Sequence, residues 1–433
     1  MRRAAGMSSL VAGLAVAIFA VGALATVEPR VGDGRDGTGA AAVIVRPGDV
    51  AALQERLRQV PNDDVTWAAL GMAYVERAKA TANPELYPKA EGALRKSLEL
   101  REDDNFAAAA GMASLANARH DFAAARQWSL DGLAVNPASS TLHGTLADAA
   151  TQLGRYQEAW EATQRMVDLS PDAASLSRVS YSWELRGDLD RARALMERTL
   201  ESALDPAQEA FARYHLGGLA LVSGDPAAAL AHYEAGLAAD PSYAALLEGR
   251  ARAHLALGRA GAAVADMAEV VTRLPEPAHV LFHGELLESL GRMEEAEQQY
   301  DLFWLEQRLF EANGVVVDVE SALFEADHGD PARAVELAET GRRTRPFIEM
   351  EAAYAWALHR AGRNEEAAAA IGRARSLGTR NPLFEFRAGV IERALGDLEA
   401  ARAHLGAALA MNPAFHPIHA PAARAALAEM AGA

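Results

Sequence analysis

The feature that most constrains the fold of this chain is a glycine that recurs at nearly constant spacing. Eight such glycines lie 33 to 38 residues apart, and an alanine follows each of them five positions later. The glycines are Gly154, Gly187, Gly224, Gly258, Gly291, Gly329, Gly362 and Gly396, and the alanines are Ala159, Ala192, Ala229, Ala263, Ala296, Ala334, Ala367 and Ala401. Apolar residues on both sides of each glycine recur at helical spacing. Each period therefore predicts two amphipathic helices joined by a tight turn, and neither helix can bury its apolar face alone.

The segment 141–171 shows how one such unit is built. Apolar residues at helical spacing stop at Gly154, resume at Tyr156 and end before Pro171. Glycine suits the end of the first helix because it adopts positive φ without strain, and proline blocks continuation of the second. A small residue such as Ala159 lets the two helices approach closely.

A period near 34 residues with a turn glycine, an alanine in the second helix and a terminal proline resembles the tetratricopeptide repeat. The terminal prolines are Pro137, Pro171, Pro241, Pro275, Pro346 and Pro413. Two earlier units, one containing Trp67–Tyr74 and one spanning Phe106–Pro137, continue the series toward the amino terminus. The resemblance implies an all-α fold, an α-solenoid of about ten helix-turn-helix repeats over residues 62–414 that winds into a superhelix.

The two ends of the chain differ from the repeats. Arg2 and Arg3 precede an uncharged stretch over residues 4–27, so residues 1–30 are predicted to be a cleaved signal peptide or an uncleaved membrane anchor. Both alternatives place the repeats outside the cytoplasmic membrane, exported to the cell envelope or secreted. Residues 31–47 are glycine-rich and predict a flexible linker. Residues 48–61 and 415–433 are predicted to form capping helices, the first starting after Asp49 and the last helix starting at residue 422.

Charge and composition exclude several classes of function. The formal charge of −17 and the lack of a Lys/Arg cluster argue against nucleic-acid binding, which needs a basic surface. Cysteine is absent, so disulfides and thiol chemistry are excluded. We find no catalytic or phosphate-binding motif. The sequence therefore predicts a protein that is not an enzyme, needs no cofactor and contacts the membrane only through its amino-terminal segment.

The resemblance also implies a binding surface, because the first helix of each repeat lines the concave groove where such proteins bind peptides. The larger side chains at these positions predict contacts with a protein or peptide partner. They are Tyr181, Glu184, Tyr214, Trp356, His359, Arg360, Phe386 and Arg393. An alternative for Trp356 and Phe386 is that they pack between repeats. A similar choice, packing or docking, applies to the aromatic stripe of residues 300–310.

A second hypothesis concerns histidine. His416 and His419 lie three residues apart, a spacing that can share a metal ion on a helix, although Pro417 and Pro421 disfavour a regular helix there. The alternative is that both are ordinary surface histidines, and we predict no metal site. The main prediction is thus a non-catalytic scaffold or assembly factor that binds protein or peptide. The rivals are a metal- or small-solute-binding envelope protein, an enzyme hidden in the groove and a self-assembling solenoid.

Overall fold

The computed structural model describes residues 49–316 and 319–432, and every regular element in these two ranges is an α-helix. The predicted signal or anchor segment 1–30 and the linker 31–47 lie outside the described residues. None of the helices in the described ranges is both long and apolar enough to span a membrane.

The helices in chain order are α1 (Val50–Gln59), α2 (Asp64–Thr81), α3 (Leu86–Leu100), α4 (Phe106–Ala118), α5 (Phe122–Val135), α6 (Ser140–Gln152), α7 (Tyr156–Leu169), α8 (Ala173–Glu184), α9 (Leu189–Glu201), α10 (Pro206–Val222), α11 (Pro226–Ala239), α12 (Ala245–Ala256), α13 (Ala260–Arg273), α14 (Pro277–Ser289), α15 (Met293–Ala312), α16 (Val319–His328), α17 (Pro331–Thr344), α18 (Ile348–Arg360), α19 (Asn364–Ala374), α20 (Pro382–Leu395), α21 (Leu398–Met411) and α22 (His419–Gly432).

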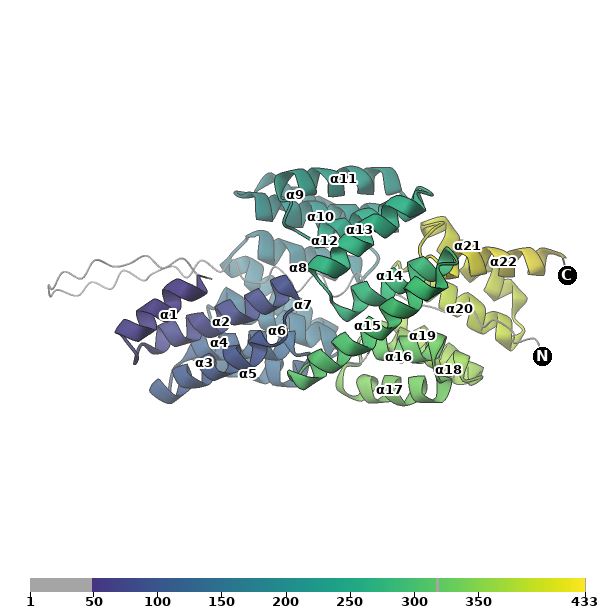
Figure 1. Ribbon diagram of the computed structural model, residues 1–433. Helices are drawn as coiled ribbons and strands as arrows, with labels where there is room; N and C mark the ends of the chain where they lie inside the picture. Colours follow the sequence, from purple (N-terminus) through teal and green to yellow (C-terminus); the bar gives the residue numbers. More distant parts are fainter. Residues whose placement is uncertain (1–48, 317–318, 433) are drawn as a thin grey trace.

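The helices pack as ten successive pairs, from α2 with α3 to α20 with α21, which confirms the α-solenoid. In each pair we call the first helix A and the second helix B. The pairs follow one another in a continuous coil from α1 through α11 to α22 (Figure 1). The two outermost helices, α1 and α22, pack on α2 and on α21.

Local sequence explains where the helices begin. Side chains of Asp49, Asp205 and Asp397 each accept a hydrogen bond from a backbone N–H three residues later, which satisfies a donor that the first helical turn leaves unpaired. Helix α1 thus starts where Asp49 predicts, and its Leu53 and Leu57 are buried against α2. The last helix begins at His419 and not at residue 422, because Pro421 falls in the first turn, where a proline removes no helical hydrogen bond.

Seven of the eight predicted turn glycines have positive φ, between 67° and 90°. The exception is Gly329, which is not in the left-handed region. Its turn is closed instead by a hydrogen bond from Asp330 N to Glu325 Oε2, at 3.0 Å. The eight predicted helix-B alanines are all buried, with exposed fractions from 0 to 4%.

We expect Ala263→Leu to destabilise the protein by about 1 to 3 kcal/mol, because Ala263 has no exposed surface and a larger side chain would overpack the contact between α12 and α13. The free energy of unfolding in urea measures the effect. Ala262→Leu is the matched control, since Ala262 is exposed on the same helix. Equal losses in the two variants would contradict close packing at this position.

Successive turns of the superhelix touch each other along a line that we call the seam. On one side are turns between helices A and B, and on the other are linkers between repeats, with partners 192 to 197 residues apart in sequence. The first of these contacts joins Val316 N to Arg119 O at 2.9 Å, and another joins Ile348 N to the Tyr156 hydroxyl at 3.0 Å. Farther along, the Thr379 hydroxyl donates to Leu185 O. The A helices therefore line an interior that the seam partly closes.

The overlong helix α15 contributes to the core through part of its aromatic stripe. Phe303 is fully buried and stacks on Phe324, with ring centroids 5.1 Å apart. Leu305 and Leu309 are exposed, because they lie on the opposite face of the helix. Packing thus accounts for the aromatic residues Tyr300, Phe303, Trp304 and Phe310 but not for Leu305 and Leu309.

Candidate partner-binding interior

The eight residues predicted to bind a partner do not form one surface. Trp356 and Phe386 are buried, with exposed fractions of 3% and 2%. The Trp356 ring N–H donates to Asp327 Oδ1 at 2.7 Å, and His419 of the terminal helix stacks on Phe386 with centroids 4.4 Å apart. These two aromatic rings thus pack between repeats, as the alternative interpretation of Trp356 and Phe386 predicts.

The neighbouring polar residues are partly accessible. Arg360 Nη1 contacts Asp327 Oδ1 at 3.1 Å, and His359 Nδ1 lies 2.7 Å from Asn364 Oδ1. Burial lowers the pKa of His359. Arg393 is at the outer end of α20, where it pairs with Glu429 at 2.7 Å. That pair is exposed to water on both sides, so it contributes little stability.

His416 and His419 are core residues and not surface histidines, with exposed fractions of 1% and 2%. His416 Nε2 lies 3.2 Å from Oε2 of Glu285, a residue of α14 that is 131 positions away in sequence. Burial, with His416 and Arg387 nearby, lowers the pKa of His419 well below its usual value. The part of the chain that the structure describes has no group of three or more His, Asp or Glu side chains placed to hold a metal ion.

The sequence did not predict that buried charged groups surround these histidines. Glu285 is fully buried on α14, and Arg387 is 2% exposed on α20. Burial raises the pKa of Glu285 well above its usual value and lowers the pKa of Arg387 to about 10. The sequence signal that could have indicated these buried charges was a charged residue among the apolar positions of a helix A. The residues around Glu285, Arg387 and the two histidines therefore form a packed polar core.

Tyr181 and Glu184 lie in a different environment, a cavity of about 100 Å³ beside the seam. We call it the seam cavity. Helices α8, α10, α12 and α14 contribute one side, and α18, α20 and the linkers before α20 and α22 contribute the other. Tyr214 lines a much smaller pocket next to it, which shares Glu184 and Arg252 with the seam cavity. Three predicted residues thus meet in one part of the interior.

A second carboxyl in the seam cavity was not predicted. Glu349, in the first turn of α18, lines the cavity with Glu184, which ends α8. Burial raises the pKa of Glu184 to about 7, and Glu349 adds to that effect. Burial likewise raises the pKa of Glu349 to about 7, against a smaller lowering by Arg345. Because the two residues are far apart in sequence, only the seam brings them together.

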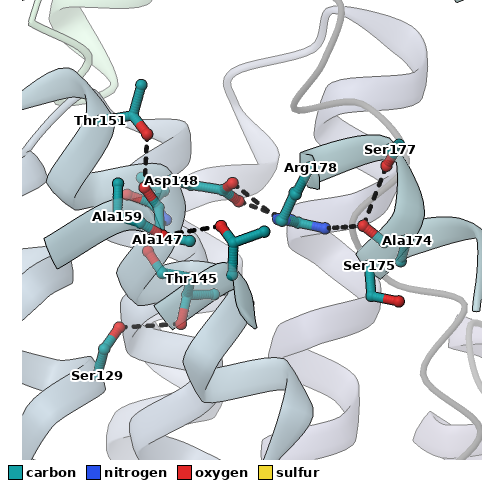
Figure 2. Close-up of polar contacts among 12 residues, drawn as sticks. Ser129, Thr145, Ala147, Asp148, Thr151, Ala159, Ala174, Ser175, Ser177 and Arg178 are labelled. Carbon is teal, nitrogen blue, oxygen red and sulfur yellow. Dashed lines mark hydrogen bonds and ion pairs between the residues drawn. The ribbon is translucent and has the colours of Figure 1, made fainter. Parts of the chain in front are cut away.

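The amino-half interior is lined mainly by small polar side chains and one strong ion pair. Arg178 of α8 binds Asp148 of α6 through two bonds, Nε to Oδ1 at 2.8 Å and Nη2 to Oδ2 at 2.7 Å (Figure 2). Arg178 Nη1 also donates to Ala174 O at 2.9 Å. Ser129 and Thr145 bond to each other in the same region, at 2.9 Å. A second cavity of about 110 Å³, which includes Lys79 and Glu276, lies between α2 to α5 and α14 to α16.

A family model described as a tetratricopeptide repeat matches residues 186–244, 214–278 and 248–303. These matches cover residues 186–303, and the ten packed helix pairs extend the same architecture along the chain. This chain contains tetratricopeptide repeats. No curated protein matches it in sequence.

Several solved structures resemble this chain in the arrangement of their helices. A human IFIT1 dimer with PPP-AAAA has 14% identity and a TM-score of 0.47, covering 76% of this chain and 77% of that one. The Cut9-Hcn1 hetero-tetramer of the APC/C has 14% identity and a TM-score of 0.43, with coverages of 88% and 81%. A repeat protein from Parabacteroides merdae has 20% identity and a TM-score of 0.36, with coverages of 60% and 98%. Likeness at this level carries no information about what this chain binds.

We expect Glu349→Gln to stabilise the protein at about pH 8 and to lose this advantage near pH 5. A carboxyl whose pKa is raised to about 7 binds its proton more tightly in the folded state. Its contribution to stability is complete below the pKa of the unfolded chain and is lost as the pH rises through 7. Glutamine resembles the protonated form at every pH, so the gain at about pH 8 should be on the order of 1 to 2 kcal/mol.

Urea unfolding of wild type and Glu349→Gln across this pH range measures that difference. Glu365→Gln, which changes an exposed carboxylate, is the control and should show no such trend. A Gln variant that is less stable than wild type at about pH 8 would contradict the buried position of the charge.

Proposed function

We propose that this protein is a non-catalytic scaffold or assembly factor that holds a protein or peptide partner in the interior of its superhelix. The observation that carries this proposal is the seam cavity, where A helices from two superhelical turns present polar side chains to an accessible space. Cavities with a few polar groups among apolar walls are the usual places where ligands bind. Tetratricopeptide repeats are in general protein-binding modules, which supports a partner of this class.

Under this proposal, some of the predicted binding residues contact the partner and others hold the surrounding helices in place. Tyr181 and Glu184 contact the partner inside the cavity, and Tyr214 lines the adjoining pocket. Arg393, which is exposed, contacts it at the carboxyl end, with His359 and Arg360 between. Trp356 and Phe386 hold these helices in place from the core.

We further propose that the protein acts outside the cytoplasmic membrane, at the cell envelope. The support is the amino-terminal sequence, two arginines followed by an uncharged stretch over residues 4–27. Protease added to intact spheroplasts should degrade the repeats if they are outside, and it should leave a cytoplasmic marker intact. Protection of the repeats in intact spheroplasts would overturn this location.

Site-specific photo-crosslinking tests the partner site directly. A photoreactive residue at Arg380, on the exposed rim of the seam cavity, should give a discrete adduct in cells. The same residue at Gln127, exposed on helix B of the second repeat, should give none. Adducts at position 127 but not at 380 would place the partner on the outer surface and overturn the proposed site.

A further inference from the structure

The two carboxyl groups of the seam cavity come from opposite sides of the seam. Glu184 is the last residue of α8, and Glu349 is the second residue of α18. Thr379 donates to Leu185 O immediately beside Glu184, and Ile348 N donates to the Tyr156 hydroxyl immediately beside Glu349. The seam contacts therefore fix both carboxyl groups at the same cavity, close enough for Glu349 to raise the pKa of Glu184.

Neither carboxyl group has an ion-pair partner among residues 49–316 and 319–432. Glu349 Oε2 is buried and accepts no hydrogen bond there. Among the cations near the cavity, Arg252 is paired with Glu248, and Arg345 donates to Gln152 and packs over the Phe347 ring. Such partly buried carboxylates without a counter-ion favour the uptake of a proton or a cation, because removing an isolated charge from water is costly.

The one cation at the rim does not neutralise them. Arg380 lines the cavity but is exposed to solvent, where water screens its charge. The pKa of both carboxyl groups is raised and not lowered, and Arg380 is not among the causes. The inner part of the cavity therefore keeps an excess of carboxylate over cation.

The other walls of the cavity suit an organic cation. Tyr181 and Phe415 provide aromatic rings, whereas the Phe282 ring is already covered by the Arg252 guanidinium, 3.9 Å from the ring centroid. Asn381 and Asn412 lie on the α20 and α22 side. Aromatic faces attract ammonium and guanidinium groups but do not replace the oxygen ligands that Ca²⁺ or Mg²⁺ needs. A volume of about 100 Å³ is suited to one alkylammonium or guanidinium group rather than a folded segment.

We propose that the seam cavity binds one organic cation, an ammonium or guanidinium group, between Glu184 and Glu349. This inference rests on the proposed function, since one source of such a group is a lysine or arginine side chain of the bound partner. The other source is a free small amine. In both cases the cation replaces protons on the two carboxyl groups, and its binding bridges two successive turns of the superhelix.

Calorimetric titration of the full-length protein with n-butylammonium chloride tests the proposal. We expect saturable binding at about pH 8 that weakens about tenfold or more at about pH 6, because protons then compete for the carboxylates. Uncharged 1-pentanol, of similar size, should not compete. The Glu184→Gln/Glu349→Gln double variant should lose at least about tenfold in affinity. Glu276→Gln, which changes a half-buried carboxyl in the other cavity, should bind as wild type does.

A capped tripeptide with a central lysine separates the two sources. Tighter binding of the peptide than of n-butylammonium, with loss for a norleucine peptide, assigns the site to a partner side chain. Binding of n-butylammonium alone assigns it to a free amine. No amine binding by wild type, or equal binding by the double variant, would overturn the proposal and leave a carboxyl pair that only shares a proton.

Two further measurements keep the test decisive. Circular dichroism melts show whether the double variant is folded. If it is not folded, the pH dependence of amine binding by wild type, and the protons released on binding, still show whether the two carboxyl groups bind the cation. The photo-adduct at position 380 is measured separately in the double variant. If the double variant still forms the adduct at position 380 but no longer binds amine, partner binding does not require the cation contact. The cation proposal would then be overturned, and the scaffold proposal would still stand.

Discussion

Asp148→Ala should destabilise this protein by about 3 kcal/mol, because it leaves the Arg178 guanidinium in the interior with only a carbonyl partner. The pair joins the A helices of adjacent repeats, and its side chains are only 9% and 12% exposed. Both bonds are short and parallel, the geometry in which an arginine and a carboxylate interact most strongly. The free energy of urea unfolding measures the loss.

The same architecture supplies a control for this prediction. Arg126 and Glu158 also join adjacent repeats through two bonds, at 2.9 and 2.8 Å, but both side chains are more than a quarter exposed. Glu158→Ala should therefore cost less than about 1 kcal/mol, since water replaces the lost partner. An Asp148→Leu/Arg178→Met variant should recover most of the stability, because it removes both buried charges. Similar losses for Asp148→Ala and Glu158→Ala would show that burial does not set the strength of these pairs.

Gly187→Ala is expected to open the superhelix as well as destabilise it. Gly187 has φ of +75°, and a Cβ atom there would overlap the backbone oxygen of Gly378 across the seam. Positive φ alone costs an alanine about 1 to 2 kcal/mol, and the overlap with rigid backbone should add about 1 to 3 kcal/mol more. Small-angle X-ray scattering should show a larger radius of gyration, because the two turns must move apart.

Gly258→Ala separates these two effects. Gly258 has nearly the same φ, +73°, but a Cβ atom there would meet no other atom within 4 Å. This variant should be destabilised only by the left-handed conformation of the alanine, and it should keep the radius of gyration of wild type. If both variants lost the same stability and kept the same radius, the seam would not be a stabilising contact in solution.

The turn glycines show how far sequence reasoning reaches. Gly187 and Gly258 occupy the same position of the repeat, and the sequence predicts the same turn for both, which the structure confirms. The sequence does not show that one turn has a neighbour and the other has none. That difference depends on how much each repeat rotates relative to the last, and the rotation accumulates over five to six repeats before the chain meets itself.

The same limit applies to the binding residues. The resemblance correctly placed Trp356 and Phe386 on A helices, but it did not reveal that α22 and the polar residues around Glu285 fill the space in front of them. Tyr181 and Glu184 were identified for the same reason and lie in a cavity instead. Their partner Glu349 was missed because its position in the first turn of α18 is not one of the central groove positions of the repeat.

The sequence by itself determined the repeat, the helix pairs, the turn glycines, the buried alanines and the capping of individual helices. These features depend on residues within about one repeat of each other, where chain connectivity already brings the groups together. Only the tertiary structure decided the seam, the cavity beside it and the pairing of Glu184 with Glu349. Those contacts join residues far apart in the chain, and small differences in linker length and helix packing decide which of them meet.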